Sequence, residues 1–182
     1  MVRRLSVVGI SGSGKSSLSL RLAVALGVQH IELDAMFHQP GWAELPPAEF
    51  RRRVEVAIQA DGWVADGNYS AVRDLVWAAA DTVVWLDLPR SLVMRRVLGR
   101  TVARAVTRRE LWNGNREPLT GMFRRDPQEN IVLWSWTNHG EFTRRYENAA
   151  SDPANAHLTF IRLRSRDEAD RLVANAAASR PT

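Results

Sequence analysis

The chain has 182 residues, which is enough for one well-buried domain and too few for two domains of ordinary size. Apolar residues make up 45% of it and charged residues 25%, a globular composition, and the absence of cysteine excludes a disulfide scaffold and a thiolate metal site. The formal net charge of +5 at pH 7 suits a nucleic acid and an anionic small substrate equally.

The first residues carry the basic pair Arg3 and Arg4, followed by an apolar run at 7–10 that meets a glycine-rich loop. This run is too short for a signal peptide or a membrane span, and no window reaches the 18 apolar residues that a membrane helix needs. Because cysteine is also absent, we expect a cytoplasmic protein without a membrane partner.

The first expected elements are a short buried strand at 5–8, a glycine-rich loop at 9–16 and a helix at 16–26. The helix has leucines four residues apart on one face and Gly27 as its C-terminal stop. The loop fits the phosphate-binding pattern GxxxxGK[ST], and strand, loop and helix in this order are the context in which that pattern binds phosphate. The rival dinucleotide pattern GxGxxG is disfavoured because its third glycine is missing.

Each residue type in the loop has a chemical reason. Glycine at positions 9, 12 and 14 lets successive backbone N–H groups point at phosphate oxygens near a helix N-terminus. Lys15 is the only lysine among 25 basic residues, and a flexible ammonium group can follow the β- and γ-phosphates where a planar guanidinium cannot. The Ser16 hydroxyl is expected to bind Mg²⁺. The residues predicted to bind ATP here are Gly9, Ser11, Gly12, Ser13, Gly14, Lys15, Ser16 and Ser17.

The rest of the chain alternates between strands and helices. This alternation predicts one domain over 1–182, with a five-stranded parallel sheet covered by helices on both faces, a three-layer α/β fold. In chain order we expect a strand at 30–33, a helix at 48–60, a strand at 63–65, a helix at 72–80, a strand at 82–86, a helix at 90–105, an irregular polar stretch at 107–126, a helix at 127–150, a strand at 158–163 and a helix at 167–178.

Three of the expected strands end in an aspartate, namely Asp34, Asp66 and Asp87. Ligands of open α/β sheets bind outside the carboxyl ends of the strands, where the glycine-rich loop also lies. We therefore expect Asp66 to bind Mg²⁺ and Asp34 to face the hydroxyl of a substrate. For Asp87 the favoured role is a helix cap, because aspartate is common at such positions.

Arginines are concentrated after the fourth expected strand. Arg96 and Arg100 lie four residues apart and so share one face of a predicted helix, although for most arginines of this region a solvated basic face is the simpler interpretation. Phosphoryl transfer depends on charge stabilisation, so a mobile arginine-rich lid at 101–126 is expected to close over the phosphates. The other arginines of this region are Arg95, Arg104, Arg108, Arg109, Arg116, Arg124 and Arg125.

With these features in place, the chain resembles the nucleoside monophosphate kinase group of P-loop proteins, and most closely the adenylate-kinase-like proteins known as DNA topology modulation proteins. The stretches that carry the resemblance are GISGSGKSS, IELDAMFHQPGW, WVADGNYS, ADTVVWLDLPR, RRVLGR and RRELWNGNREP. It implies a P-loop NTPase fold, with ATP and Mg²⁺ held by Lys15, Ser16 and Asp66 and with Arg96 and Arg100 on ATP at the lid.

The resemblance also implies an acceptor on the side of Asp34 and Arg73. DGNYS lacks the Phe-Pro-Arg of adenylate kinases, and the lid has no cysteines for zinc. The acceptor is therefore a nucleotide-like molecule or another small alcohol, as in shikimate and gluconate kinases. The residues expected to contact it are Asp34, Trp42, Gly67, Asn68 and Arg73.

The leading interpretation is an ATP-dependent phosphotransferase that moves the γ-phosphoryl group to a small acceptor, for which a nucleotide or nucleoside-like molecule is preferred. Lys15, Asp34, Arg96 and Arg100 are its expected catalytic residues. One alternative is a small-metabolite kinase, and another is a nucleotide-binding protein that associates with DNA through its basic charge. A GTPase is disfavoured because the guanine signature Asn-Lys-x-Asp needs a second lysine. Most of the seven tryptophans are expected in the core, and Trp42 and Trp112 are kept as candidate contacts of the acceptor or the base. For His38, four residues after Asp34, an ordinary surface or loop histidine is favoured over a place in the acceptor pocket.

Overall fold

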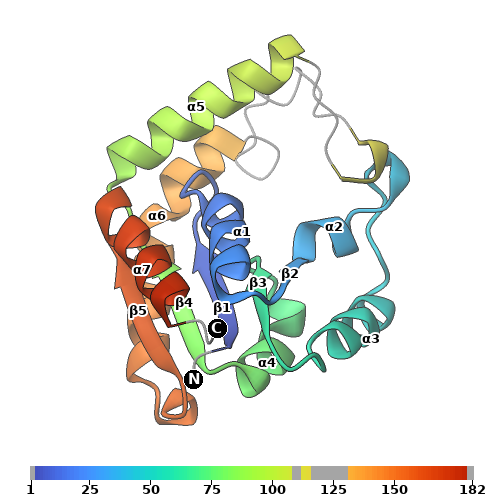
Figure 1. Cartoon of the computed structure of the whole chain (residues 1–182). Coiled ribbons are helices and arrows are strands. Elements are labelled where there is room, and N and C mark those ends of the chain that lie inside the picture. Colours follow the sequence, from blue (N-terminus) through green and yellow to red (C-terminus); the bar gives the residue numbers. More distant parts are fainter. Residues whose placement is uncertain (1–2, 108–111, 116–130, 180–182) are drawn as a thin grey trace.

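In the described part of the chain, five strands form one sheet whose neighbouring strands are all parallel (Figure 1). The computed structural model describes residues 3–107, 112–115 and 131–179. The spatial order is β2-β3-β1-β4-β5, so the expected five-stranded parallel sheet is confirmed. The strands are β1 Arg4–Gly9, β2 Gln29–Glu32, β3 Trp63–Asp66, β4 Thr82–Leu86 and β5 Thr159–Leu163.

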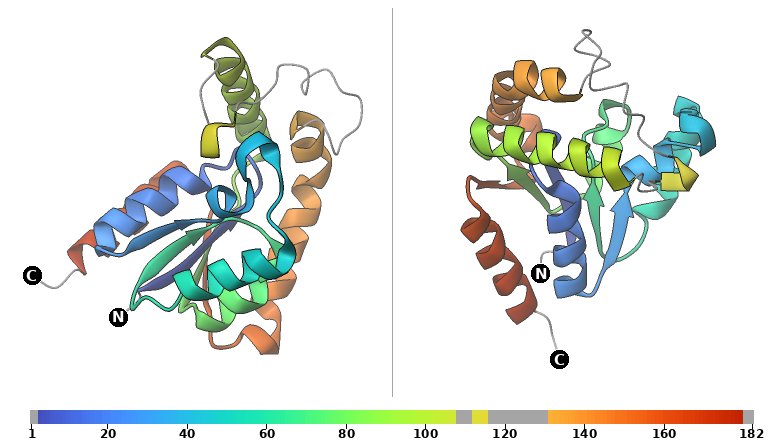
Figure 2. Two further views of the ribbon diagram at one scale, coloured as in Figure 1. Left: turned by 90° about the vertical axis from the view of Figure 1, so that its right-hand side faces the viewer. Right: turned by 90° about the horizontal axis from the view of Figure 1, so that it is seen from above.

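Helices cover both faces of the sheet (Figure 2). α1 and α7 pack against each other on one face, α4 and α6 lie on the other with α3 beside α4, and α5 crosses above the carboxyl ends of the strands. The helices are α1 Lys15–Leu26, α2 Leu33–Phe37, α3 Pro47–Ala57, α4 Ser70–Ala79, α5 Arg90–Thr107, α6 Ile131–Ser151 and α7 Arg166–Ala178, with short 3₁₀ turns η1 Pro40–Trp42, η2 Trp112–Gly114 and η4 Pro153–Asn155.

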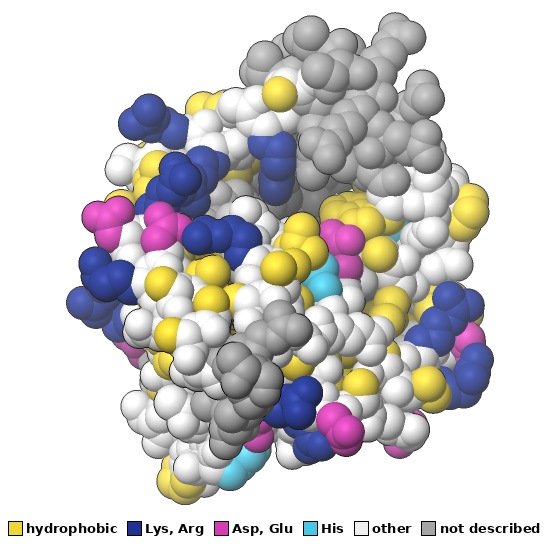
Figure 3. Space-filling model, in the orientation of Figure 1, with side chains coloured by type: hydrophobic (Ala, Val, Ile, Leu, Met, Phe, Trp, Pro, Cys, Tyr) yellow, Lys and Arg dark blue, Asp and Glu magenta, His cyan; other side chains and the backbone are white. Residues whose placement is uncertain are grey.

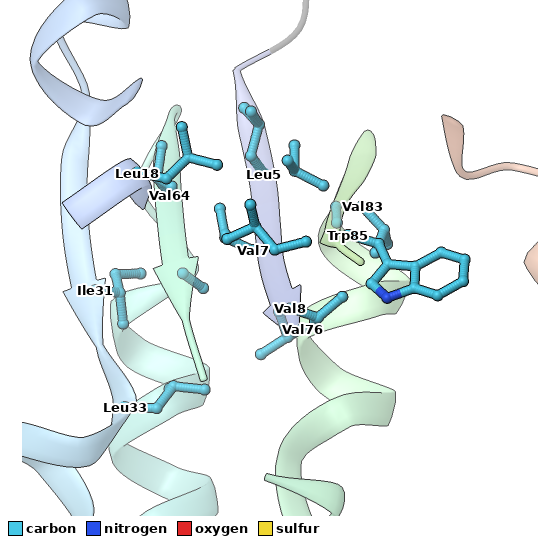
Figure 4. Close-up of a cluster of buried hydrophobic side chains, with 14 of the residues drawn as sticks. Leu5, Val7, Val8, Leu18, Ile31, Leu33, Val64, Val76, Val83 and Trp85 are labelled. Carbon is cyan, nitrogen blue, oxygen red and sulfur yellow. The ribbon is translucent and has the colours of Figure 1, made fainter. Parts of the chain in front are cut away.

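The core lies along the three central strands. β1, β3 and β4 are buried on both faces, as their continuous runs of β-branched and other apolar residues predict. Side chains of β1 lie between those of β3 and β4 in Figure 4, where Val7, Val64 and Val83 are completely buried. The register pairs Val7 with Asp66 on one side and with Val84 on the other. The carboxyl ends of the central strands therefore meet at one edge of the sheet.

The second strand ends earlier than expected. β2 stops at Glu32, and Leu33 and Asp34 belong to the five-residue helix α2, so the expectation that Asp34 ends a strand is wrong. Leu33 is 3% exposed, so its side chain anchors this turn in the core. It packs closely on Gly67, where an added Cβ would lie only 2.9 Å from the Leu33 Cβ. A helix of five residues without a side-chain cap leaves no periodic pattern to detect.

Part of the predicted lid at 101–126 is described. Residues 101–107 form the last turns of α5, and 112–115 contain η2. Residues 108–111 and 116–126, with Arg108, Arg109, Arg116, Arg124 and Arg125, lie outside the described residues, as does the expected helix start at 127. In the portion of the chain that is described, no helix combines the length and apolar character needed to cross a bilayer.

Candidate active site

The glycine-rich loop joins β1 to α1 at the carboxyl edge of the sheet, so the predicted order of strand, loop and helix is confirmed. Gly12 and Gly14 have φ values of +84° and +98°, a backbone conformation that favours glycine. A Cβ at Gly12 would lie 2.3 Å from a methyl carbon of Val97 on α5. The loop thus needs glycine here both for its conformation and for its contact with α5.

Lys15 and Asp66 form the charged centre of the site. Burial lowers the pKa of Lys15, while the nearby carboxylates of Asp66 and Asp34 raise it. Asp66 ends β3 with 2% of its surface exposed, and burial raises its pKa against the opposing effect of Lys15. The Lys15 ammonium donates a hydrogen bond to the Ile10 carbonyl at 3.4 Å. The one lysine of the chain therefore lies between the loop and two carboxylates.

The residues at this centre fit a magnesium ion held together with phosphates. Among the described residues, no hydrogen bond of normal geometry reaches either buried carboxylate oxygen of Asp66, which is costly unless a cation or water satisfies them, and the Ser16 hydroxyl lies near enough to lower the pKa of this carboxyl. Ser16 lies at the start of α1, where the pattern places the hydroxyl that binds the ion. Mg²⁺ is usually bound by one or two carboxylates with substrate phosphates and water, so Asp66 and Ser16 are a sufficient protein contribution.

Two arginines of α5 reach the loop. Arg96 donates a hydrogen bond to the Ser13 carbonyl at 2.9 Å, and Arg100 donates one to the Ser11 hydroxyl at 2.9 Å. The structure thus brings Arg96 and Arg100 to the predicted phosphate site. Figure 3 shows basic side chains gathered over α5 and the upper part of α7, on the same side of the molecule.

A cavity of about 430 Å³ opens beside the loop, a volume suited to a small-molecule ligand. It extends from the loop and the α5 arginines to the start of α7, where sequence reasoning expected no site. Ser165 caps α7 by accepting a hydrogen bond from the Glu168 amide, a pattern that predicts a helix start and says nothing about a ligand. The lining residues that the sequence analysis did not assign to a site are Leu18, Arg21, Leu86, Leu88, Ser165, Arg166 and Ala169.

On the other side of Lys15, Asp34 is held by Tyr69. The Tyr69 hydroxyl donates a hydrogen bond to Asp34 Oδ1 at 2.7 Å and lies 3.4 Å from His38 Nε2. Burial raises the pKa of the Tyr69 phenol, and the Asp34 carboxylate raises it further. The sequence analysis did not include Tyr69, although it stands in the quoted stretch WVADGNYS.

A small aromatic group surrounds His38. Its ring stacks on Trp112 at a centroid distance of 6.0 Å and meets the edge of Trp42 at 5.3 Å. Asn115 joins this group, because its amide donates to the Gln39 carbonyl at 2.8 Å and accepts from the Trp42 amide at 2.9 Å. Trp42 and Trp112 therefore lie together near Asp34, where acceptor contacts were predicted, and His38 is packed rather than an ordinary loop histidine.

Three other predicted acceptor contacts have different surroundings. Gly67 packs against Leu33, and the Asn68 amide is paired with the backbone of Gly9. Arg73 lies over the Trp77 ring at 5.7 Å and lines a water-sized cavity of about 10 Å³, whereas Asp34 contacts Tyr69. Asp34 and Trp42 thus lie near the Tyr69 hydroxyl and the His38 ring, whereas the side chains of Asn68 and Arg73 contact Gly9 and Trp77.

Asp87 does not cap a helix, so that expectation is wrong. α5 begins at Arg90, and the Asp87 carboxylate instead accepts hydrogen bonds from Arg162 at 2.6 Å and from Thr143 at 2.9 Å. The partners come from β5 and α6, which are distant in sequence and could not be foreseen from a local pattern.

The tryptophan prediction is confirmed in part. Trp63, Trp77 and Trp85 are buried in the core. Trp136 is 52% exposed, and the Arg90 guanidinium lies 3.5 Å from the centre of its ring, so the expectation of a core position is wrong for this residue. The side chain of Trp134 lies outside the described part, as does that of Arg104.

Comparison with known proteins gives related kinases. No protein-family model matches the chain. A shikimate kinase of Mycobacterium ulcerans is 33% identical over 116 residues, a match that covers 56% of this chain and 63% of the relative. A shikimate kinase of Synechococcus elongatus is 29% identical over 134 residues, covering 62% of this chain and 70% of the relative. The chain thus spans a little under two thirds of the mycobacterial relative.

Among solved structures, a gluconokinase from Sinorhizobium meliloti superposes with a TM-score of 0.49 and 19% identity, covering 97% of this chain and 90% of that one. The relatives found by sequence support the broad resemblance to P-loop kinases and give no support to the narrower one to adenylate-kinase-like topology modulation proteins. The chain has the parallel sheet and phosphate loop of the P-loop kinase fold, and over somewhat more than half of its length it is similar to shikimate kinases.

Proposed function

We propose that this protein is a kinase that transfers the γ-phosphoryl group of ATP to a hydroxyl of a small molecule. The observation that carries the proposal is the position of Lys15, which is half-buried at the start of α1, contacts the Ile10 carbonyl of the glycine-rich loop and lies near enough to Asp66 and Asp34 for their carboxylates to raise its pKa. A lone ammonium group there would neutralise charge on the transferring phosphoryl group.

The residues around Lys15 would bind different parts of MgATP. The loop amides would bind the phosphates, and the Ser16 hydroxyl and Asp66 would hold Mg²⁺, which would supply positive charge against the charge that develops on the phosphates. Arg96 and Arg100 already contact the loop and would transfer those contacts to phosphate oxygens. The base and ribose of ATP would occupy the cavity that extends to the start of α7.

Asp34 would orient the acceptor hydroxyl or remove its proton. One carboxylate oxygen is occupied by the Tyr69 hydroxyl, which leaves the other for the acceptor. The rings of Trp42, Trp112 and His38 would line the far side of the acceptor.

The similarity to shikimate kinases favours a small hydroxylated metabolite over the nucleotide-like acceptor that the sequence analysis preferred. Shikimate is therefore the first acceptor to test. The DNA-associated alternative is supported by net charge alone, and it predicts binding that weakens steeply with salt.

The test is a coupled assay of ADP release with MgATP and a panel containing shikimate, gluconate and nucleoside monophosphates. An acceptor should accelerate ADP release by the wild type, and the Lys15→Ala and Asp34→Asn variants should each lose roughly 100-fold or more of kcat/KM. Asp61→Asn changes an exposed carboxylate and should keep wild-type activity. If ATP binds and no acceptor in the panel accelerates its consumption, the kinase proposal fails in favour of a binding role.

A further inference from the structure

The side chain of Asn68 pairs with both backbone groups of Gly9, the first residue of the glycine-rich loop. Its amide nitrogen donates to the Gly9 carbonyl at 2.6 Å, and its amide oxygen accepts from the Gly9 N–H at 3.2 Å. The two residues are 59 positions apart in the sequence. Asn68 follows β3, so these bonds connect the neighbouring strand to the end of β1.

These two bonds take the place of further strand pairing between β1 and β3. On the β4 side, β1 is paired through Gly9 and Leu86, but on the β3 side the strand pairing ends at Val7 and Asp66. A side-chain amide has the same donor and acceptor groups as a peptide unit. Asn68 therefore continues the hydrogen bonding of β3 to β1 for one more residue, up to the start of the loop.

We propose that Asn68 is a positioning residue of the phosphate loop, which fixes Gly9 so that the loop amides after it stay aimed at the phosphates. This role concerns the loop rather than the acceptor. It rests on the proposed function only in that the phosphates belong to a nucleotide.

Gly9 is a position where such support matters. Its φ is +151°, and a Cβ would lie 2.8 Å from the Leu86 carbonyl oxygen and 2.9 Å from the Ser13 hydroxyl oxygen. A larger residue cannot stiffen this position, so the restraint must come from outside the loop. Two neighbours restrain the loop: Val97 of α5 packs closely against Gly12, and the Asn68 amide is hydrogen-bonded to Gly9.

A third element fixes the amide itself. The hydroxyl of Tyr146, a completely buried residue of α6, donates a hydrogen bond to the Asn68 oxygen at 3.3 Å. The Asn68 oxygen thus accepts from both Gly9 and Tyr146, and its nitrogen is directed at the Gly9 carbonyl. α6 therefore also reaches the start of the loop, through one side chain.

The pairing explains why asparagine stands at this position. Aspartate has the same size but an ionised carboxylate has no donor, so it would face the Gly9 carbonyl oxygen with a repulsive contact. Alanine would leave the Gly9 N–H and carbonyl without these partners. Both substitutions remove the donated bond, and only alanine also removes the side-chain volume.

The experiment measures MgATP affinity by calorimetry for the wild type, Asn68→Ala and Asn68→Asp, with amide hydrogen exchange of residues 9–14 in the ligand-free proteins. We expect both variants to bind MgATP roughly tenfold more weakly and to exchange the loop amides faster. Tyr146→Phe keeps both bonds to Gly9 and should show a smaller loss. Thermal unfolding of each variant shows that it is folded.

Asn155→Ala is the matched control, because Asn155 also donates a side-chain bond to a backbone carbonyl, that of Ala149 at 2.9 Å, in the turn before β5. This variant should keep wild-type nucleotide affinity whatever it loses in stability. Wild-type protein that does not bind MgATP would overturn the proposed function, while loop exchange would still test the role of Asn68. If Asn68→Asp binds MgATP and exchanges its loop amides as the wild type does, the inference is overturned. This outcome decides the question even when Asn68→Ala does not fold.

Discussion

Among single residues, Tyr69 most directly affects the phosphoryl transfer that we propose, because its hydroxyl contacts Asp34. It donates to Asp34 Oδ1 at 2.7 Å and so fixes which carboxylate oxygen remains for an acceptor. Tyr69→Phe removes this bond and keeps the ring packing against Phe37 and Phe50. We expect kcat to fall about tenfold with little change in the KM for ATP, since a lost orientation acts on the chemical step.

A double-mutant cycle decides whether Tyr69 acts through Asp34. In an Asp34→Asn background, Tyr69→Phe should have almost no further effect on kcat, because two residues that act as a unit are not additive. Steady-state kinetics of the four proteins measures this coupling. Additive losses would contradict the assignment of Tyr69 as a residue that positions Asp34.

At this scale, the sequence indicated which residues lie at the carboxyl edge and not what they contact. Lys15 and Asp66 could be placed from their spacing, because a loop motif and a strand end define positions at the carboxyl edge of the sheet. The hydrogen bonds of Asn68 could not be predicted, since its partner Gly9 is 59 residues away. Asp87 was misjudged for the same reason, as Arg162 lies on another strand.

Among the elements, α5 packs against the glycine-rich loop on one face and is exposed on another, so glycines on the two sides should respond differently to substitution by alanine. Gly99 in its interior is exposed, and a Cβ there would meet nothing within 4 Å, whereas one at Gly12 would meet Val97 at 2.3 Å. Gly99→Ala should therefore stabilise the protein by about 0.5–1 kcal/mol, the usual gain of alanine over glycine in a helix.

Gly12→Ala is the opposing case, and it should lower both the unfolding temperature and the affinity for MgATP. Thermal unfolding and calorimetry of the two variants check the pair. A destabilising Gly99→Ala would show that α5 does not have the regular exposed turn that the structure gives it.

The strands were easier to predict than the short helical pieces. β4 has the predicted bounds, because a run of β-branched residues buried on both faces is distinctive at a length of five. α2 was missed because the burial of Leu33 and its close contact with Gly67, rather than any local signal, determine the turn. Tertiary packing therefore set the position of Asp34, and with it the candidate acceptor side of the site.

For the whole molecule, the topology followed from the alternation of elements, but the shape of the ligand cavity did not. Parallel strands with intervening helices require a sheet covered on both faces, and the carboxyl edge then follows. The cavity also needs the start of α7, which reaches the loop through its packing on α1. Contacts between the two ends of the chain are invisible to local patterns, so Ser165 and Arg166 were missed.

The charged centre also affects the stability of the whole fold. Burial raises the pKa of Asp66 above its ordinary value of 3.8, so between these two values the folded state binds more protons than the unfolded state. The free energy of unfolding therefore falls as pH rises through this window and stays lower above it. Without nucleotide and Mg²⁺, Asp66→Asn should unfold a few degrees above the wild type at pH 7.

The advantage of Asp66→Asn should disappear as the pH falls below the ordinary pKa of aspartate, because the wild-type carboxyl is then protonated in both the folded and the unfolded state. Asp61→Asn, at an exposed position, should not change the unfolding temperature at any pH. Addition of MgATP should reverse the order at pH 7, because only the wild type retains the carboxylate that we assign to the ion. An Asp66→Asn protein less stable than the wild type in the absence of ligand would contradict this account, since the buried charge would then stabilise the fold rather than be retained for binding.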